Sequence, residues 1–214
     1  MRWILALLAV LSTVFLLMPI LYRRIGHISR RWRLVVKMIP TLMCAAFAGT
    51  AYWGGGDRYA LLVFIGLCVC AAADGLLGVH FITGGAFFFA GHMFYIAAFC
   101  TQQRPTWWSL PVFAAMLGLL WLFLEHFRKD MNAHMFVLVR IYSAALAVVL
   151  ALSIPMPFLA CSQRALLAAL GAVIFVLSDM GVCHGMLCKI SPRRDFAYLG
   201  IYYLAQLLLG LSAF

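Results

Sequence analysis

Two aspartates stand inside apolar stretches of the sequence, where a charged side chain needs a reason. Asp74 lies in CVCAAADGLLGV, residues 68–79, and Asp179 lies in VLSDMG, residues 176–181. A charge at the centre of a membrane helix costs about 2.5–3.5 kcal/mol on insertion scales. Two carboxyl groups in one low-dielectric layer can hold one proton between them, which supplies an acid and a base at neutral pH. We therefore interpret Asp74 and Asp179 as a catalytic pair, with either residue as the acid.

Other polar side chains fall at similar depths in their own apolar runs. His92 and Tyr95 are three residues apart, as are Tyr203 and Gln206, so each pair shares one face of a helix. The candidates for substrate binding or positioning are Lys37, His92, Tyr95, Tyr142, Ser178, Tyr203 and Gln206. Structural roles stay open for several of them. Lys37 is also a candidate ion-pair partner for either aspartate, Lys37 and Arg140 can extend to lipid headgroups, and His92 and Gln206 can hydrogen-bond between helices.

The elements that position these residues are membrane helices, because the composition excludes a water-soluble globule. Hydrophobic residues make up 66% of the 214-residue chain and charged residues only 10%, against about 45–50% and 25% in soluble domains. The net charge of +10 arises mostly in short loops between apolar runs, which indicates contact with anionic headgroups and not with nucleic acid.

The chain contains eight apolar runs of the length that crosses a bilayer. They cover about 3–22, 33–53, 59–78, 84–102, 106–125, 133–153, 164–183 and 195–213. The first run is longer than a signal-peptide core and ends at YRR, so we expect it to be retained. The fold class predicted is all-α: a single domain over residues 1–214, formed by one bundle of eight transmembrane helices.

Basic residues predict the orientation of this bundle. The loops after the first, third, fifth and seventh runs carry ten Lys and Arg residues, and the opposite side carries four. The positive-inside rule therefore places both termini on the non-cytoplasmic side. In this orientation all the polar residues above lie about 5–17 Å from the cytoplasmic ends of their helices, and the outer halves of the helices carry few ionisable groups.

Two other functions fit parts of this pattern. Asp, Lys and His inside a membrane also mark transport paths, although the polar layer stops near the middle of the bilayer. His80, His92 and His184, together with the two aspartates, are candidate zinc ligands for a metal-dependent lipid hydrolase. The seven cysteines are scattered, and their spacing matches neither a zinc site nor a disulfide framework, so no metal and no cofactor is predicted.

Several segments together resemble one family of membrane proteins. They are KMIPTLM (37–43), ADGLL (73–77), FFFAGHMFYIAAF (87–99), IYS (141–143), GAVIFVLSD (171–179) and YYLAQLLLGLSA (202–213). In their order along the chain they resemble the YhhN-type lysoplasmalogenases, which are eight-helix membrane proteins.

The resemblance implies an activity and its partners. Such enzymes cleave the vinyl-ether bond of 1-alkenyl-glycerophosphoethanolamine or -choline, which releases a fatty aldehyde and the glycerophospho-alcohol. The expected partners are thus a lysophospholipid substrate and membrane lipids. The short N-terminus favours a bacterial inner membrane, with the endoplasmic reticulum membrane as the site in a eukaryote.

Overall fold

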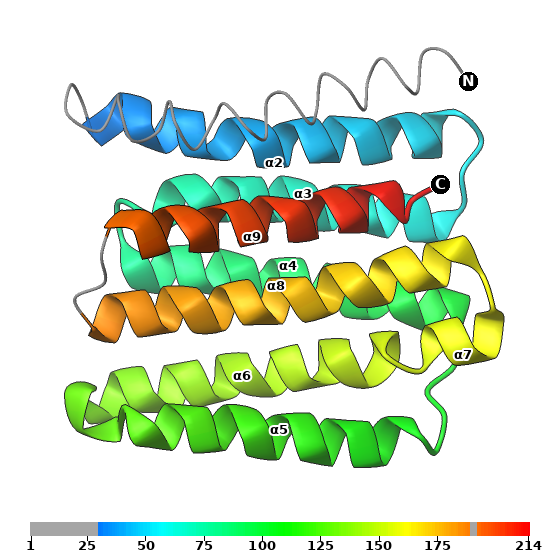
Figure 1. The fold of residues 1–214 in the computed structure, drawn as a ribbon. Helices are drawn as coiled ribbons and strands as arrows, with labels where there is room; N and C mark the ends of the chain where they lie inside the picture. Colours follow the sequence, from blue (N-terminus) through cyan, green and yellow to red (C-terminus); the bar gives the residue numbers. More distant parts are fainter. Residues whose placement is uncertain (1–29, 189–191) are drawn as a thin grey trace.

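The computed structural model describes residues 30–188 and 192–214, and almost all of them are helical (Figure 1). Two short pieces, the 3-10 turn η1 (Arg128–Asp130) and α7 (Met156–Ala160), lie in connections. The described part contains no β-strand. The long helices are α2 (Arg30–Trp53), α3 (Arg58–Leu77), α4 (Phe81–Gln102), α5 (Ser109–His126), α6 (Ala133–Ser153), α8 (Gln163–Leu187) and α9 (Pro192–Leu211).

Six of the described helices are long and apolar enough to cross a membrane, where α6 is counted together with α7 as Ala133–Ala160. The apolar part of α9, Phe196–Leu211, is shorter. These helices confirm the prediction of a polytopic, all-α membrane protein. The first of the eight predicted spans, 3–22, lies outside the described residues. The count of eight and the orientation therefore stay predictions.

The helix boundaries agree with the predicted spans within a few residues, and the differences have local causes. Helix α4 starts at Phe81 and not near residue 84, because the ring nitrogen of His80 accepts a hydrogen bond from the Thr83 backbone N–H and caps the helix. Helix α8 continues to Leu187, four residues past its predicted end. The connection after α6, predicted as a break, contains the short helix α7.

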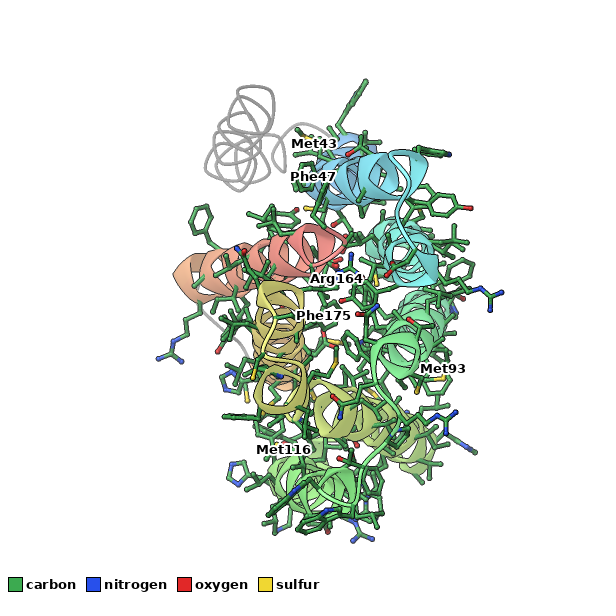
Figure 2. All side chains as sticks on the ribbon, turned by 90° about the vertical axis from the view of Figure 1, so that its right-hand side faces the viewer. Met43, Phe47, Met93, Met116, Arg164 and Phe175 are labelled. Atoms are coloured by element: carbon green, nitrogen blue, oxygen red, sulfur yellow. The ribbon has the colours of Figure 1, made fainter. Side chains whose placement is uncertain are left out.

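Viewed along its axis, the bundle is a closed ring of six long helices (Figure 2). The neighbours in this ring are α2, α3, α4, α6, α8 and α9, with α9 returning to α2. Helix α5 stays outside the ring and packs chiefly on α6. Phe175 of α8 is buried within the ring, whereas Met93 of α4 is exposed on its outer face. The ring therefore encloses an interior that side chains from all six helices reach.

The surface of the bundle matches a lipid environment. Large apolar side chains such as Leu119, Leu122, Leu170 and Leu177 are all exposed. An exposed apolar surface of this extent is unusual for a soluble monomer and is expected where lipid tails cover the protein. The interior instead contains many small side chains, which let membrane helices approach closely.

Helices α3 and α4 approach each other closely at Gly84. A Cβ atom built on Gly84 would lie 2.4 Å from the Cα atom of Leu77, at the end of α3. At the neighbouring Gly85 a Cβ atom would meet nothing within 4 Å. Gly84 is therefore needed for packing, while Gly85 faces open space.

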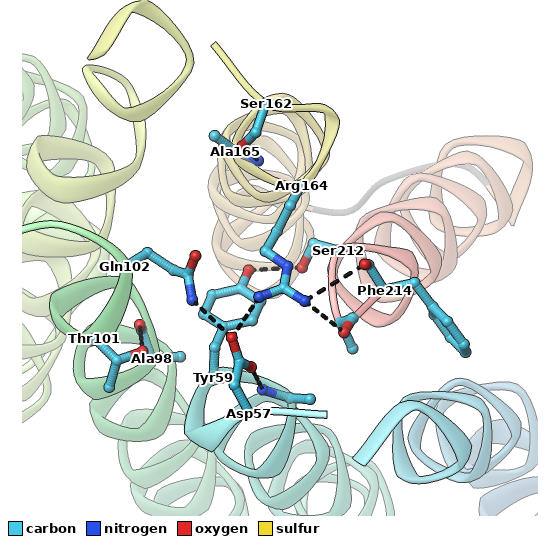
Figure 3. A network of polar contacts seen from close by, with 12 residues as sticks. Asp57, Tyr59, Ala98, Thr101, Gln102, Ser162, Arg164, Ala165, Ser212 and Phe214 are labelled. Atoms are coloured by element: carbon cyan, nitrogen blue, oxygen red, sulfur yellow. Dashed lines mark hydrogen bonds and ion pairs between the residues drawn. The ribbon is translucent and has the colours of Figure 1, made fainter. Parts of the chain in front are cut away.

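One end of the ring is held by a network of polar contacts between helix ends (Figure 3). The Arg164 guanidinium of α8 donates to the Asp57 carboxylate at 2.6 Å, and also to the backbone carbonyls of Ala213 and Phe214. Asp57 precedes α3 and accepts from the Ala60 backbone N–H. Partial burial raises the pKa of Asp57, but the hydrogen bonds from Ala60 and Arg164 outweigh that effect and leave the pKa below its usual value. The network ties α3, α8 and the C-terminal end of α9 together.

Candidate active site

A cavity of about 990 Å³ opens at the opposite end of the bundle, where α4 and α6 begin. Its walls come from α2, α3, α4, α5, α6, α8 and α9, and most of the lining side chains are apolar. Exposed polar side chains at its mouth are His80, Asn132 and His134. The polar residues deeper inside include Lys37, Asp74, Tyr142, Asp179 and Tyr202. A volume near the upper end of the range for small-ligand pockets suits a long apolar ligand.

Asp74 is fully buried in the wall of this cavity and is surrounded by hydrogen-bond donors. Its Oδ2 atom accepts from the Thr41 hydroxyl at 2.8 Å and from the Tyr202 hydroxyl at 2.8 Å. The Lys37 ammonium lies 3.4 Å from Oδ1. Two hydroxyl donors and one cation match the charged form of a carboxyl group. The Lys37 side chain is 18% exposed and that of Asp74 only 1%, so Lys37 is the more accessible member of the ion pair.

Asp179 has a different environment, although it lines the same cavity. Its Oδ2 atom accepts a short hydrogen bond of 2.5 Å from the Tyr142 hydroxyl. Within the described chain its carboxyl group forms no ion pair. Asp179 is partly exposed and lines the cavity, whereas Asp74 is fully buried. Asp179 is therefore the carboxyl group of the pair that a ligand can touch directly.

A second polar cluster is buried beside the cavity and does not line it. The His92 Nδ1 atom lies 2.6 Å from the carbonyl of Phe88, one turn earlier in α4. The Tyr95 hydroxyl donates to the Gln206 Oε1 atom at 3.1 Å. His92 Nε2 and Gln206 Nε2 are buried without a hydrogen-bond partner among the described residues. The His92 ring stands 5.4 Å from that of Tyr142, edge to face. The two clusters are therefore in contact through Tyr142.

The two remaining sequence candidates contact backbone atoms. Ser178 is buried, and its hydroxyl lies 3.5 Å from the carbonyl of Tyr198 in α9. The Tyr203 hydroxyl donates to the carbonyl of Lys37 at 2.9 Å. Both therefore join α9 to neighbouring helices, and neither lines the cavity.

Sequence reasoning chose neither Thr41 nor Tyr202 as a site residue. Both side chains donate directly to Asp74. Thr41 is four residues after Lys37 and shares its helix face, which is a signal that could have identified it. Tyr202 was passed over for its neighbour Tyr203, because the sequence does not show which of two adjacent tyrosines faces the ring interior.

The histidines considered as zinc ligands lie apart in the structure. His80 is at the cavity mouth and contacts Thr83, His92 is buried, and His184 lies 3.5 Å from the Tyr198 hydroxyl. In the part of the chain that the structure describes, no group of three His, Cys, Asp or Glu residues is placed to hold a metal ion.

Comparison with known proteins yields one family and two named relatives. The sequence model of the YhhN family matches residues 32–213. The human protein "Lysoplasmalogenase TMEM86A" is 29% identical over 158 residues, which cover 71% of this chain and 64% of the human protein. The pig protein "Lysoplasmalogenase TMEM86B" is 29% identical over 184 residues, which cover 83% of this chain and 74% of the pig protein. The match to the human relative therefore spans less than two thirds of its length. No solved structure matches the chain.

Proposed function

The chain belongs to the YhhN family, and from that membership we propose that it is a lysoplasmalogenase-like ether hydrolase. The proposed substrates are 1-alkenyl-glycerophosphoethanolamine and 1-alkenyl-glycerophosphocholine. The proposed products are a fatty aldehyde and glycerophosphoethanolamine or glycerophosphocholine. The observation that supports this reaction most directly is the carboxyl group of Asp179, which lines a large apolar cavity and is hydrogen-bonded to Tyr142.

Hydrolysis of a vinyl ether begins with protonation of carbon, which requires an acid held against the double bond. We assign this proton to Asp179, because no cation pairs with its carboxyl group in the described chain, whereas Lys37 matches the charge of Asp74. The Tyr142 hydroxyl donates to Oδ2, which leaves Oδ1 to carry the acidic proton toward the ligand. General acid catalysis of this kind contributes about 10²–10⁴-fold.

The remaining steps return Asp179 to its starting state. Its proton goes to the alkenyl carbon remote from oxygen, and the double-bond electrons form the new C–H bond. The other alkenyl carbon becomes part of an oxocarbenium ion, which the new Asp179 carboxylate stabilises, as carboxylates do in glycoside hydrolysis. Water adds to that carbon and gives a proton to Asp179. The hemiacetal then breaks its bond to the glycerol oxygen, which takes the hemiacetal hydroxyl proton, and the aldehyde is released.

Lys37 and Asp74 would bind the polar part of the substrate. The Lys37 ammonium has three N–H donors, and one of them is directed at Asp74. The others are available for the substrate phosphate, which is separated from the vinyl ether only by glycerol. In this proposal Thr41 and Tyr202 hold Asp74 by hydrogen bonds. The charge of Asp74 holds Lys37 in turn and so positions the substrate. His92 contacts the Tyr142 ring, and Tyr95 contacts His92 and donates to Gln206. In this proposal these three residues position Tyr142, with Ser178 and Tyr203 fixing α9.

The cavity also fits a lipid with one chain. Its apolar walls suit the alkenyl tail, and its mouth, with His80, Asn132 and His134, suits a headgroup. The mouth lies at the end of the bundle that the basic residues assign to the cytoplasm. We propose that substrate enters from the cytoplasmic leaflet of the membrane. In a bacterium this membrane is the inner membrane.

The test is aldehyde release by the purified full chain in detergent micelles. 1-Alkenyl-glycerophosphoethanolamine should yield aldehyde, and an acyl lysophospholipid of equal chain length should yield no fatty acid. Asp179→Asn should lower kcat about 100-fold or more. The matched control Asp57→Asn, at the other end of the bundle, should keep kcat within about twofold of the wild type.

Two results would contradict the proposal. Hydrolysis of the acyl lysophospholipid alone would make the protein a different lipid hydrolase. Normal aldehyde release by Asp179→Asn, with Asp57→Asn equally active, would remove Asp179 from the chemistry.

A further inference from the structure

Arg140 is a charged residue within the apolar helix α6 that the proposed reaction does not use. Its side chain extends to α5, where the guanidinium carbon lies 4.4 Å from the centre of the Trp121 ring. The same carbon is 5.0 Å from the ring of Phe136, one turn earlier in α6. Contact with two aromatic rings holds the guanidinium group at this position.

This guanidinium group lacks a hydrogen-bond acceptor. Arginine has five N–H donors, and in the described chain those of Arg140 have no acceptor. The Nε atom is buried and unpartnered, and no carboxylate of the described residues forms an ion pair with the group. A stacked guanidinium group without an acceptor indicates that the acceptor comes from outside the protein.

A second arginine contacts the same ring. The guanidinium carbon of Arg128, in η1, lies 5.4 Å from the centre of the Phe136 ring. Arg128 is paired with Glu125 at 2.8 Å, so that carboxylate is already used. We call Trp121, Glu125, Arg128, Phe136 and Arg140 the α5–α6 arginine cluster. It contains two cations and one anion, so its net charge is positive.

The position of the cluster along α6 fits the polar edge of a bilayer. Arg140 is seven residues after Ala133, where α6 begins, which is about 10 Å along the helix. Its side chain extends back toward that end, since it reaches Phe136. Trp121 is 36% exposed, and tryptophan is enriched at the level of lipid headgroups.

We propose that the α5–α6 arginine cluster binds the phosphodiester group of an anionic phospholipid, with the lipid chains lying along α5 and α6. The planar fork of Arg140 can donate two parallel hydrogen bonds to the phosphate. The net positive charge selects a headgroup such as phosphatidylglycerol over phosphatidylcholine, because the choline cation cancels the charge of its phosphate.

The site has a structural consequence for the cavity. Helix α5 packs chiefly on α6 and lies outside the ring. Its residues Leu120, Phe123 and Leu124 nevertheless form part of the cavity wall. A lipid bound across α5 and α6 therefore also holds that wall in place.

Native mass spectrometry of the full chain, released from an uncharged maltoside detergent, tests the site directly. Phosphatidylglycerol or phosphatidylcholine is added in increasing amounts, and retained lipid is counted. Wild-type protein should retain one phosphatidylglycerol with about tenfold higher apparent affinity than phosphatidylcholine, and Arg140→Gln should lose about tenfold in that affinity. Arg140→Lys keeps the charge without the fork and should fall between the two. Arg104→Gln removes one exposed arginine between α4 and α5 and should bind like the wild type.

Three outcomes would overturn the inference. Equal retention of both lipids by the wild type would show that the cluster does not select an anionic headgroup. Undiminished affinity in Arg140→Gln, or in Arg140→Lys if the glutamine variant does not fold, would show that the guanidinium fork is not the ligand. Full displacement of the bound lipid by millimolar inorganic phosphate would make free phosphate the occupant. None of these results depends on whether the protein hydrolyses lysoplasmalogen.

Discussion

The Lys37–Asp74 ion pair gives a quantitative test of the site that does not need a substrate. Asp74 is almost completely covered, while Lys37 is 18% exposed at the cavity. Removal of one partner from a buried pair typically costs about 3–5 kcal/mol, because the other charge is left without compensation. In Lys37→Met, Asp74 keeps its hydrogen bonds from Thr41 and Tyr202. We therefore expect a loss near the lower limit, about 3 kcal/mol of unfolding free energy.

The reverse substitution should cost less, because the remaining charge has water nearby. In Asp74→Asn the ammonium group of Lys37 can turn into the cavity, so we expect a loss of about 1 kcal/mol. The double variant carries neither charge and should also lose about 1 kcal/mol, which makes the coupling energy about 3 kcal/mol. For a chain of this length, 3 kcal/mol corresponds to a shift of about 6–12 °C in Tm.

The assay is thermal unfolding of the four proteins in one detergent, followed by circular dichroism. Lys129→Met is the matched control, because Lys129 is an exposed lysine in η1 and its replacement should change stability by less than about 0.5 kcal/mol. Additive losses in the double variant, about 4 kcal/mol in total, would refute the ion pair. So would a Lys37→Met protein as stable as the wild type.

Two further predictions concern the rest of the bundle. Gly84→Ala should lower stability by about 1–3 kcal/mol, because the new methyl group would collide with the backbone of Leu77. Gly85→Ala should instead raise stability by up to about 1 kcal/mol, because alanine has the higher helix propensity. Equal melting temperatures of the two variants would contradict the close approach of α3 and α4. Asp57→Asn should cost less than about 1 kcal/mol at pH 7, since the Asp57 side chain is half exposed in its pair with Arg164. Because the pKa of Asp57 is lowered in the folded state, this stabilisation is present above about pH 4 and is lost as the pH falls through the folded pKa. The melting temperatures of the wild type and Asp57→Asn should therefore converge at low pH. A constant difference between them over the pH series would contradict the prediction.

The sequence was sufficient to predict the class of fold and to group four polar residues at one level. Hydropathy gave span limits that the long helices of the described chain follow within a few residues, because a bilayer imposes both length and composition on a helix. Depth followed from counting along each helix at 1.5 Å per residue. That arithmetic placed Lys37, Asp74, Tyr142 and Asp179 at one level, and the structure brings all four to one cavity.

The direction in which each side chain points was harder to predict. Helices that are apolar all round carry no periodicity to show which face turns inward, so the rotation is set by contacts such as Gly84 against Leu77. For this reason Ser178, next to Asp179, was chosen as a site residue although it faces the backbone of α9. Thr41 was missed for the same reason, because its role depends on how α2 rotates toward Asp74 on α3.

The two ends of the ring bear on the choice between a hydrolase and a transporter. The cavity that contains Asp179 is lined by residues from the ends of the helices near His80 and His134. At the opposite end Arg164 joins α8 to Asp57 before α3 and to the carbonyls of residues 213 and 214. Transport by alternating access would require these contacts to break in each cycle and open a second mouth. Hydrolysis of a lipid requires only the mouth that the structure already has, because the substrate and both products can use the same leaflet. The arrangement of the described helices therefore favours the enzyme over the transporter.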